Sequence, residues 1–161
     1  MLKLELTEVV ATLANFNART EKNGSDRVPA ASLKFSCNQP PDVLAHFAES
    51  LKGTLFTTDK DLGGDTYRLR DTGIVYPMNR SEEMYGCTLR IGYGIGNPIE
   101  LPDSHAHSFE ITPLDGGTVK LVFTVNCKPD ADKDVPVLYR MQAQGVQISL
   151  EPAEELAEAD D

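Results

Sequence analysis

Strict alternation of apolar and other residues is the feature that most constrains the fold of this chain. The clearest run ends at Cys127, and its apolar positions are Val119, Leu121, Phe123, Val125 and Cys127. Successive side chains of a β-strand point to opposite faces, so a period of two predicts a strand with one buried face. The chain therefore has to form a layered structure in which one side of each strand lies in a core.

Further segments show the same alternation, and a slip in the pattern near Glu8 and Val9 separates the first two. These segments are residues 2–7, 10–19, 31–37, 88–95, 107–112 and 146–150. In the segment 107–112, His107 is predicted to share its face with Phe109 and Ile111. Each segment is long enough for one strand of a globular protein.

Two turn signals join strands into hairpins. Asn23-Gly24 follows the segment 10–19, and Asp115-Gly116-Gly117 precedes the clearest run. Both signals suit tight turns because their residues tolerate positive φ. With about seven strands at hairpin spacing, the sequence predicts a mainly β, antiparallel fold, either a β-sandwich or an open barrel.

Between residues 40 and 53 the period changes from that of a strand to that of a helix. One helical face there consists of Val43, Leu44, Phe47, Ala48 and Leu51. We expect one short helix that packs across an end of the β structure. Residues 138–141 are expected to add a helical turn. The irregular segment 57–86, with a short strand near 67–70, is typical of a binding loop or lid.

Charge is distributed unevenly along the 161 residues. The formal net charge is −10, and six carboxylates lie near the C-terminus: Glu151, Glu154, Glu155, Glu158, Asp160 and Asp161. Removing these six from the 25 acids leaves 19 against 15 bases. That balance excludes a uniformly basic nucleic-acid binder but not a local basic groove. We expect one β-rich domain over residues 1–150 and an acidic, flexible tail over residues 151–161.

The sequence also bears on the compartment of the protein. Cys37, Cys87 and Cys127 occur without CxxC spacing and are expected to be free thiols. No apolar stretch approaches the ~20 residues that a membrane-spanning helix needs. The first ten residues alternate and include acids, unlike a secretory signal. These observations predict a cytoplasmic protein that does not contact a membrane.

Motifs for catalysis or cofactor binding are not found in the sequence. The glycine-rich stretch 92–96 is followed by Asn97-Pro98, which cannot begin the helix that a phosphate loop requires. His105 and His107 would share one face of a strand, but a metal site needs a third ligand, so two ordinary histidines are expected. The sequence therefore predicts a non-enzymatic protein without a cofactor or a metal.

Cations interleaved with aromatic residues suggest a groove for single-stranded DNA, in which cations contact phosphates and rings stack on bases. The candidate contacts are Arg19, Lys22, Tyr67, Arg68, Arg70, Tyr76, Arg80 and Arg90. The two tyrosines would stack on bases, and the cations would contact phosphate. Acids such as Asp65 and Glu82 lie in the same irregular segment. A solvated surface of mixed charge is therefore the competing interpretation.

The acidic tail also has two interpretations. Acidic termini often only keep a protein soluble and disordered. Alternatively, the tail occupies a basic groove of its own domain until nucleic acid displaces it, or it recruits a partner protein. Single-strand binding proteins of bacteria and phages do this, commonly with an aromatic residue near the terminus. This chain ends in Glu158-Ala159-Asp160-Asp161 and has no such aromatic residue.

Several segments resemble small, uncharacterised proteins of tailed bacteriophages and prophages, which tend to be encoded among recombination and replication functions. The similar segments are NFNAR at 15–19, VPA at 28–30, LKF at 33–35, VFTV at 122–125 and VQISLEP at 146–152. The resemblance implies a non-enzymatic phage accessory protein of DNA recombination or replication, in the cytoplasm of a bacterial host. It would bind single-stranded DNA or a DNA-processing protein, as a monomer or a homo-oligomer.

Two alternatives remain open at this point. The first is an acidic interaction protein that mimics the charge of DNA and inhibits or recruits a host protein. The second is a virion or assembly component.

Overall fold

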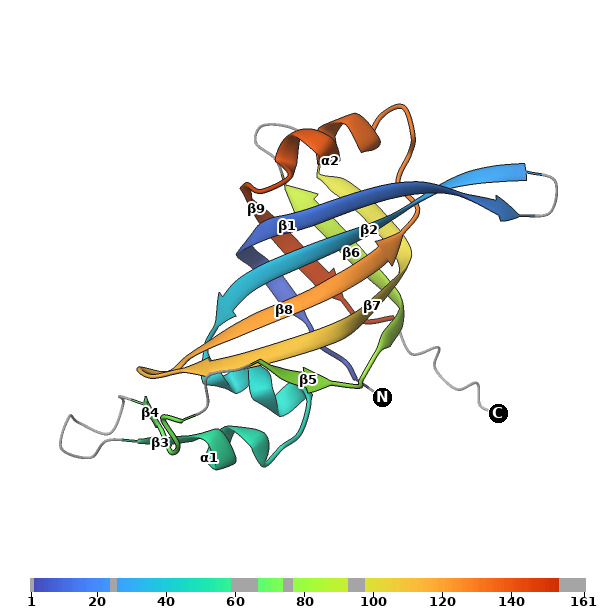
Figure 1. Cartoon of the computed structure of the whole chain (residues 1–161). Helices are drawn as coiled ribbons and strands as arrows, with labels where there is room; N and C mark the ends of the chain where they lie inside the picture. The colour runs from blue at the N-terminus through green and yellow to red at the C-terminus, as the bar shows by residue number, and fades with distance from the viewer. Residues whose placement is uncertain (1, 24–25, 59–66, 74–76, 93–97, 154–161) are drawn as a thin grey trace, which may run out of the picture.

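The structure is a computed structural model that describes residues 2–23, 26–58, 67–73, 77–92 and 98–153, with the backbone alone at 21–23 and 26–28. Long strands make up most of it (Figure 1). They are β1 (Leu6–Asn23), β2 (Asp26–Gln39), β6 (Met84–Gly92), β7 (Ile99–Leu114), β8 (Thr118–Cys127) and β9 (Gly145–Glu151). The shorter strands are β3 (Phe56–Thr58), β4 (Tyr67–Leu69) and β5 (Met78–Arg80).

The long strands form one closed antiparallel barrel. Their order is β1, β2, β8, β7, β6, β9, and β9 pairs again with β1. The pairing of β7 with β8 completes the ring, and β5 pairs with β7 beyond the end of β6. Closure satisfies the backbone groups that an open sheet leaves at its edges. The prediction of a mainly β, antiparallel fold is confirmed.

Extra residues in the strands explain where the simple alternation breaks. Between Leu6 and Val9, β1 advances three residues while β9 advances two, and Glu8 takes a positive φ of 46°. The slip that the sequence shows near Glu8 is therefore a β-bulge. A second shift, after Leu13, lets both Leu13 and Phe16 face the core although they are three residues apart.

A third bulge contradicts one sequence prediction. His107 was expected on the face of Phe109 and Ile111. The register of β7 against β8 shifts between His107 and Glu110, and Ser108 has a φ of 57°. Because this extra residue reverses the alternation, Phe109 and Ile111 point into the barrel while His107 lies on its outer surface beside His105.

The barrel interior is filled by aliphatic side chains around a line of phenylalanine rings. The ring of Phe123 lies 5.8 Å from Phe35 and 5.6 Å from Phe109, and the ring of Phe109 lies 5.4 Å from Phe47. Leu2 and Leu4 precede the first strand, yet both are buried in the same core. The inward positions predicted for β8 and β9 are all buried, as their alternation indicates.

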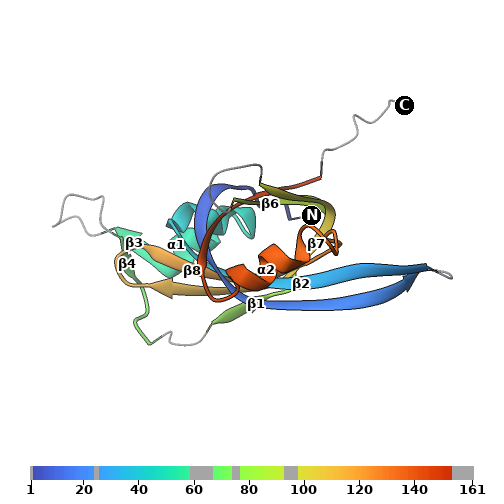
Figure 2. The ribbon, with the colours of Figure 1, turned by 90° about the horizontal axis from the view of Figure 1, so that it is seen from above.

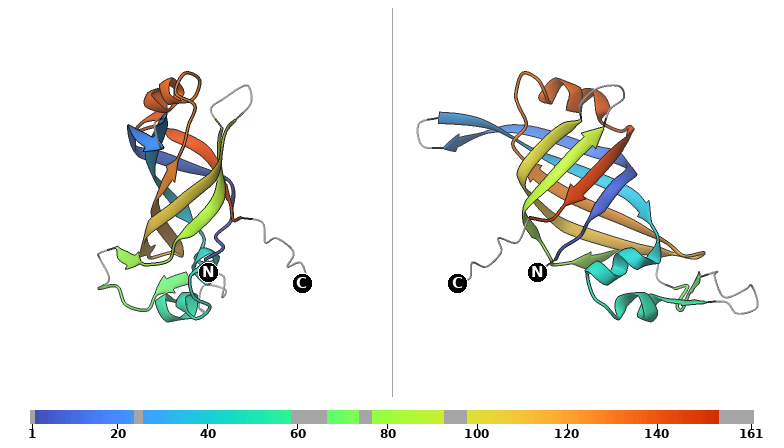
Figure 3. Two further views of the ribbon diagram at one scale, coloured as in Figure 1. Left: turned by 90° about the vertical axis from the view of Figure 1, so that its right-hand side faces the viewer. Right: turned by 180° about the vertical axis from the view of Figure 1, so that it is seen from behind.

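Short helices close the two ends of the barrel. Helix α2 (Val135–Met141) lies over one end, while α1 (Leu51–Leu55), the 3-10 helix η1 (Pro41–His46) and the β3–β4 pair lie at the other (Figures 1 and 3). The β1–β2 hairpin extends past the barrel wall (Figure 2). No helix in the described part of the chain is long and apolar enough to cross a membrane.

The single helix expected between residues 40 and 53 is split in the structure. Residues 41–46 form the 3-10 helix η1, and a short α-helix starts again at Leu51. The prolines Pro40 and Pro41 start the segment, and the poor helix formers Ser50 and Gly53 lie near its end, so a continuous α-helix is weakly favoured. Burial of Val43 and Leu44 against the barrel end determines the conformation instead. The helical turn expected at 138–141 is confirmed within α2.

The cysteines are free and buried, as the sequence predicts for unpaired thiols. Burial raises the pKa of Cys37 to about 11 and that of Cys127 to about 12, from an unfolded value of 9.0. Above pH 9 the unfolded chain therefore loses these protons while the folded chain keeps them.

We expect this difference to make the protein less stable in alkali. Between about pH 9 and pH 11 each of the two thiols should lower the free energy of unfolding by about 1.4 kcal/mol per pH unit. Urea unfolding followed by circular dichroism over this range measures the slope. The variant C37A/C127A is the control, because lysines and tyrosines titrate alike in both proteins. Equal slopes for the two proteins would contradict the prediction.

Candidate nucleic-acid interface

Residues 84–99 and 135–150 contain no aspartate or glutamate, and neither do three segments on neighbouring strands, although acids make up 25 of the 161 residues. The three segments are residues 9–20, 27–41 and 116–129, and they carry the cations Arg19, Arg27, Lys34, Lys120 and Lys128. They correspond to β1, β2 and β8, which are neighbours in the barrel. Folding therefore gathers three acid-free segments into one wall.

We call the outward side chains of residues 11–20, 30–39 and 118–128 the acid-free face. The three strands lie side by side at the front of the barrel in Figure 1. Their inward positions are apolar, and their outward positions are mostly serine, threonine, asparagine and lysine. The face thus combines hydrogen-bonding groups with positive charge and contains no carboxylate.

Register aligns these polar side chains in rows across the strands. One row joins Asn17, Ser32 and Asn126 to His105 of β7. The next row joins Asn15, Lys34 and Thr124 to His107. Directly opposite residues on neighbouring strands have Cβ atoms about 4.5–5.5 Å apart, so each row is a continuous strip of side chains.

Hydrogen bonds connect part of the first row. Arg19 Nη1 donates to Ser32 Oγ at 2.7 Å, and Ser32 Oγ donates to Asn126 Oδ1 at 2.8 Å. Arg19, Lys34, Lys120 and Lys128 are all exposed. Because these cations reach solvent, a polyanion can contact them.

Two hollows open on the acid-free face. One, of about 730 Å³, lies over β1, β2 and β8 and is lined by Thr12, Ser36, Asn38 and Lys120 among others. The other, of about 210 Å³, lies where this face meets β7, and its lining includes Arg19, Asn126, Lys128, His105 and the acid Asp103. Each hollow places a cation beside amide or hydroxyl groups, which is the chemistry that binds phosphate and sugar oxygens.

A stack of three rings borders the acid-free face on β6 and β7. Tyr85 lies parallel to His105, with ring centroids 4.2 Å apart and planes inclined by 6°. His105 in turn stacks on His107 at 4.8 Å. Glu83 contacts Tyr85 and the middle ring, His105: the Tyr85 hydroxyl donates to Oε2 at 3.2 Å, and His105 Nε2 lies 3.1 Å from Oε1. The hydrogen bond to Glu83 raises the pKa of Tyr85, which keeps the phenol neutral.

His105 and His107 were predicted to share a face, and they do. Nδ1 of His107 lies 2.8 Å from the Ser108 hydroxyl, while its buried Nε2 has no hydrogen-bond partner among the described residues. Within that part of the chain, no group of three or more His, Cys, Asp or Glu side chains is placed to hold a metal ion.

The structure distributes the predicted DNA contacts over several places. Arg19 lies on the acid-free face, and Lys22 lies further along β1 in the extended hairpin. Three more lie in and just after β4, at the end of the barrel away from α2 (Figure 3): Tyr67, Arg68 and Arg70. Tyr76 falls outside the described residues. The predicted residues whose side chains the structure describes therefore do not line one continuous groove.

Local contacts explain the positions of the residues around β4. The ring of Tyr67 packs edge-on against Phe56, and Lys52 Nζ lies 5.0 Å from the centroid of the Tyr67 ring. Arg70 Nε donates to the carbonyl of Gly53 at 2.7 Å. These contacts hold the β3–β4 pair to α1.

The two remaining arginines, Arg80 and Arg90, are paired with acids. Arg80 forms a two-bond ion pair with Glu82, at 2.6 and 3.0 Å. Arg90 bonds to Glu100 and to Glu151, and the hydrogen bond to Glu100 is the main reason that its pKa is raised. Their charges are balanced locally, which makes them weaker candidates for phosphate contacts.

The position of Glu151 also differs from the predicted tail. Glu151 is the last residue of β9, and its carboxylate binds Arg90 Nη1 at 2.5 Å. Glu154, Glu155, Glu158, Asp160 and Asp161 lie outside the described residues.

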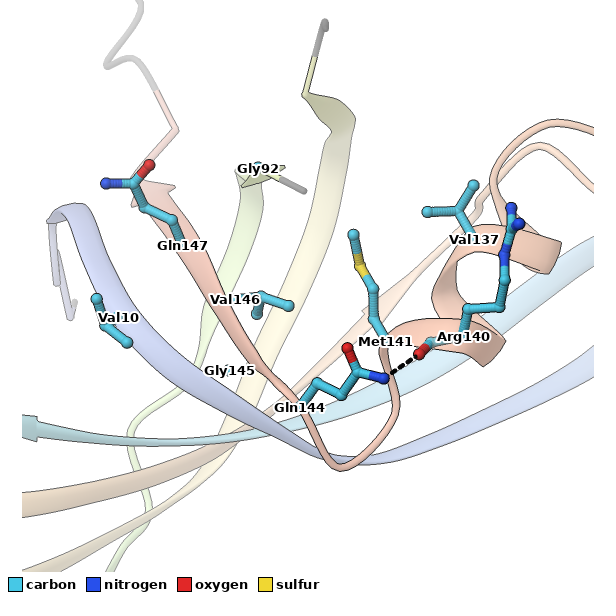
Figure 4. A pocket seen from close by; sticks show the side chains of 9 residues that line it. All are labelled: Val10, Gly92, Val137, Arg140, Met141, Gln144, Gly145, Val146 and Gln147. Atoms are coloured by element: carbon cyan, nitrogen blue, oxygen red, sulfur yellow. Dashed lines mark hydrogen bonds between the residues drawn. The ribbon is translucent and has the colours of Figure 1, made fainter. Parts of the chain in front are cut away.

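A further hollow, of about 690 Å³, lies between α2 and the strands β1, β6 and β9 (Figure 4). Val10, Val137, Met141 and Val146 supply its apolar walls. Gln144 Nε2 donates to the carbonyl of Arg140 at 2.9 Å. Among the described lining residues Arg140 is the only ionisable one, and they include no nucleophile–base pair.

The contacts chosen from the sequence did not include Lys34 or Tyr85, and Lys120 and Lys128 were missed altogether. The signal that could have found the lysines is the absence of acids from three separate segments. Its meaning depends on the pairing of β2 with β8, which are about 90 residues apart in the chain.

Comparisons with known proteins provide no information about the interface. No protein-family model, no curated protein and no solved structure matches this chain.

Proposed function

We propose that this protein binds single-stranded nucleic acid across the acid-free face, as an accessory protein of phage DNA recombination or replication. The observation that carries the proposal is the separation of charge. Three neighbouring segments hold five cations and no acid, while the rest of the chain holds 25 acids and ten cations. An acidic protein that keeps one wall free of carboxylates has a surface suited to a polyanion.

The composition of the face supports a single strand more than a duplex. Serine, threonine and asparagine side chains in adjacent rows offer hydrogen bonds to sugars and exposed bases, and the bordering rings can stack on bases. In the described chain no helix of groove-reading length projects from the barrel.

A salt titration tests the proposal. We expect a fluorescein-labelled oligo-dT to bind the full chain, with affinity falling as salt rises. Four phosphate contacts predict a slope of about −2.8 for log Kobs against log [salt], or about fifty-fold between about 50 and 200 mM salt. Fluorescence anisotropy measures the affinity, and an unlabelled duplex of equal length serves as competitor.

Two outcomes would contradict the proposal. Absence of binding at low salt would remove direct nucleic-acid binding and favour the acidic interaction protein instead. Binding that does not change with salt would show that the cations of the acid-free face are not the contacts.

A further inference from the structure

The open ring of Tyr85 lies where a row of the acid-free face ends. That row consists of Asn17, Ser32, Asn126 and His105. Tyr85, on the next strand β6, pairs with His105 of β7. Tyr85 is 58% exposed, so much of its ring is open to solvent. Because His105 covers one face of the ring, the exposed area belongs to the opposite face and the edge.

The ring is also held in a defined orientation. Its hydroxyl donates to Glu83, and the same carboxylate contacts His105 through its other oxygen. His107 supports the stack from behind. A ring held in this way loses little conformational freedom when a second aromatic group stacks on it.

Phosphate-binding chemistry lies next to this ring. His105 lines the hollow that also contains Arg19, Asn126 and Lys128. A nucleotide whose base lies on Tyr85 would therefore have its phosphate near these cations. Asp103 also lines the hollow and can accept a hydrogen bond from a base or a sugar hydroxyl.

We propose that the outer face of Tyr85 is a stacking site for one nucleobase of a bound single strand. The inference rests on the proposed function and adds the place where a base is held. Stacking tolerates any base, so the site selects single-stranded nucleic acid without selecting a sequence. An oligo-dT and an oligo-rU in the test distinguish DNA from RNA as the source of the base.

The absence of tryptophan from the chain makes a direct test possible. Tyr85→Trp places a single tryptophan at the site, and stacking on a base should quench its emission. The matched control is Tyr139→Trp, because Tyr139 is 56% exposed but lies on α2. Its emission should stay unchanged. An abasic oligonucleotide, which keeps the phosphates, should bind Tyr85→Trp without quenching it.

Anisotropy with the same oligonucleotides distinguishes failure of the stacking site from failure of the proposed function. Binding without quenching of Tyr85→Trp would overturn the stacking site and leave the proposed function standing. No binding to wild type would remove both. In the same assay Tyr85→Ala should weaken binding about 5- to 150-fold, while Tyr85→Phe should bind nearly as well as wild type. Equal affinities of Tyr85→Ala and wild type would also contradict the inference.

Discussion

The double variant K34E/K120E is expected to bind a single-stranded oligonucleotide about 100-fold more weakly than wild type. Both lysines are exposed on the acid-free face, on adjacent strands. Each substitution removes a phosphate contact and places a carboxylate against the strand. The loss corresponds to about 2.7 kcal/mol, and the salt slope should become shallower by about 1.4.

The matched control is R68E/R140E, which makes the same change in net charge outside the acid-free face. Arg68 lies on β4 and Arg140 on α2, both exposed. Its affinity should stay within about three-fold of wild type, because neither arginine belongs to the acid-free face and salt screens the longer-range effect of their charges. Anisotropy titrations of the three proteins at one salt concentration measure the effect, and thermal melts verify folding.

The control also separates the two locations of the binding site. Arg68 belongs to the residues that the sequence alone proposed as DNA contacts. If R68E/R140E lost binding while K34E/K120E kept it, the site would lie near Arg68 or Arg140 and the acid-free face would be wrong.

Phe123→Ala is expected to lower the free energy of unfolding by about 3–5 kcal/mol. Phe123 is fully buried, and its ring contacts Phe35 and Phe109 from neighbouring strands. Removing the ring loses its transfer free energy and leaves a cavity, because closed barrel walls cannot move together freely. The loss is a large part of the about 5–15 kcal/mol that stabilises an ordinary domain.

Urea unfolding followed by circular dichroism measures this difference. The control is Val122→Ala, one residue earlier in β8 and on the outer side of the barrel, where the side chain is half-buried. We expect it to cost less than about 1 kcal/mol. Similar losses for the two variants would mean that the inward and outward faces of β8 are not those described.

Much of the fold follows from local pattern. The inward positions of β8 and β9 were predicted from alternation, since that pattern depends only on neighbouring residues in a strand. The slip at Glu8 was visible for the same reason. His107 was predicted on the wrong face because no glycine or other typical turn residue marks the bulge at Ser108 in the sequence. The helix expected at 40–53 was split because packing on the barrel end outweighed a weak helical preference.

The candidate site was much harder to predict. Arg19 was identified, but Arg80 and Arg90 were chosen by residue type, and the structure pairs both with nearby acids. Tyr85 was passed over as a contact although it is the most exposed ring of the described chain. Its significance depends on His105 and Glu83, which reach it only through strand pairing and local geometry.

The amino-acid sequence by itself determined that this protein consists of antiparallel strands with one apolar side, and which residues point inward wherever no unpredicted bulge intervenes. Those properties arise from the alternation of side chains along a single strand. Only the tertiary structure decided which strands are neighbours, and with them the closed barrel, the acid-free face and the row that ends at Tyr85. Every strand offers a similar apolar side, so the pairing of distant strands depends on contacts that no local pattern specifies.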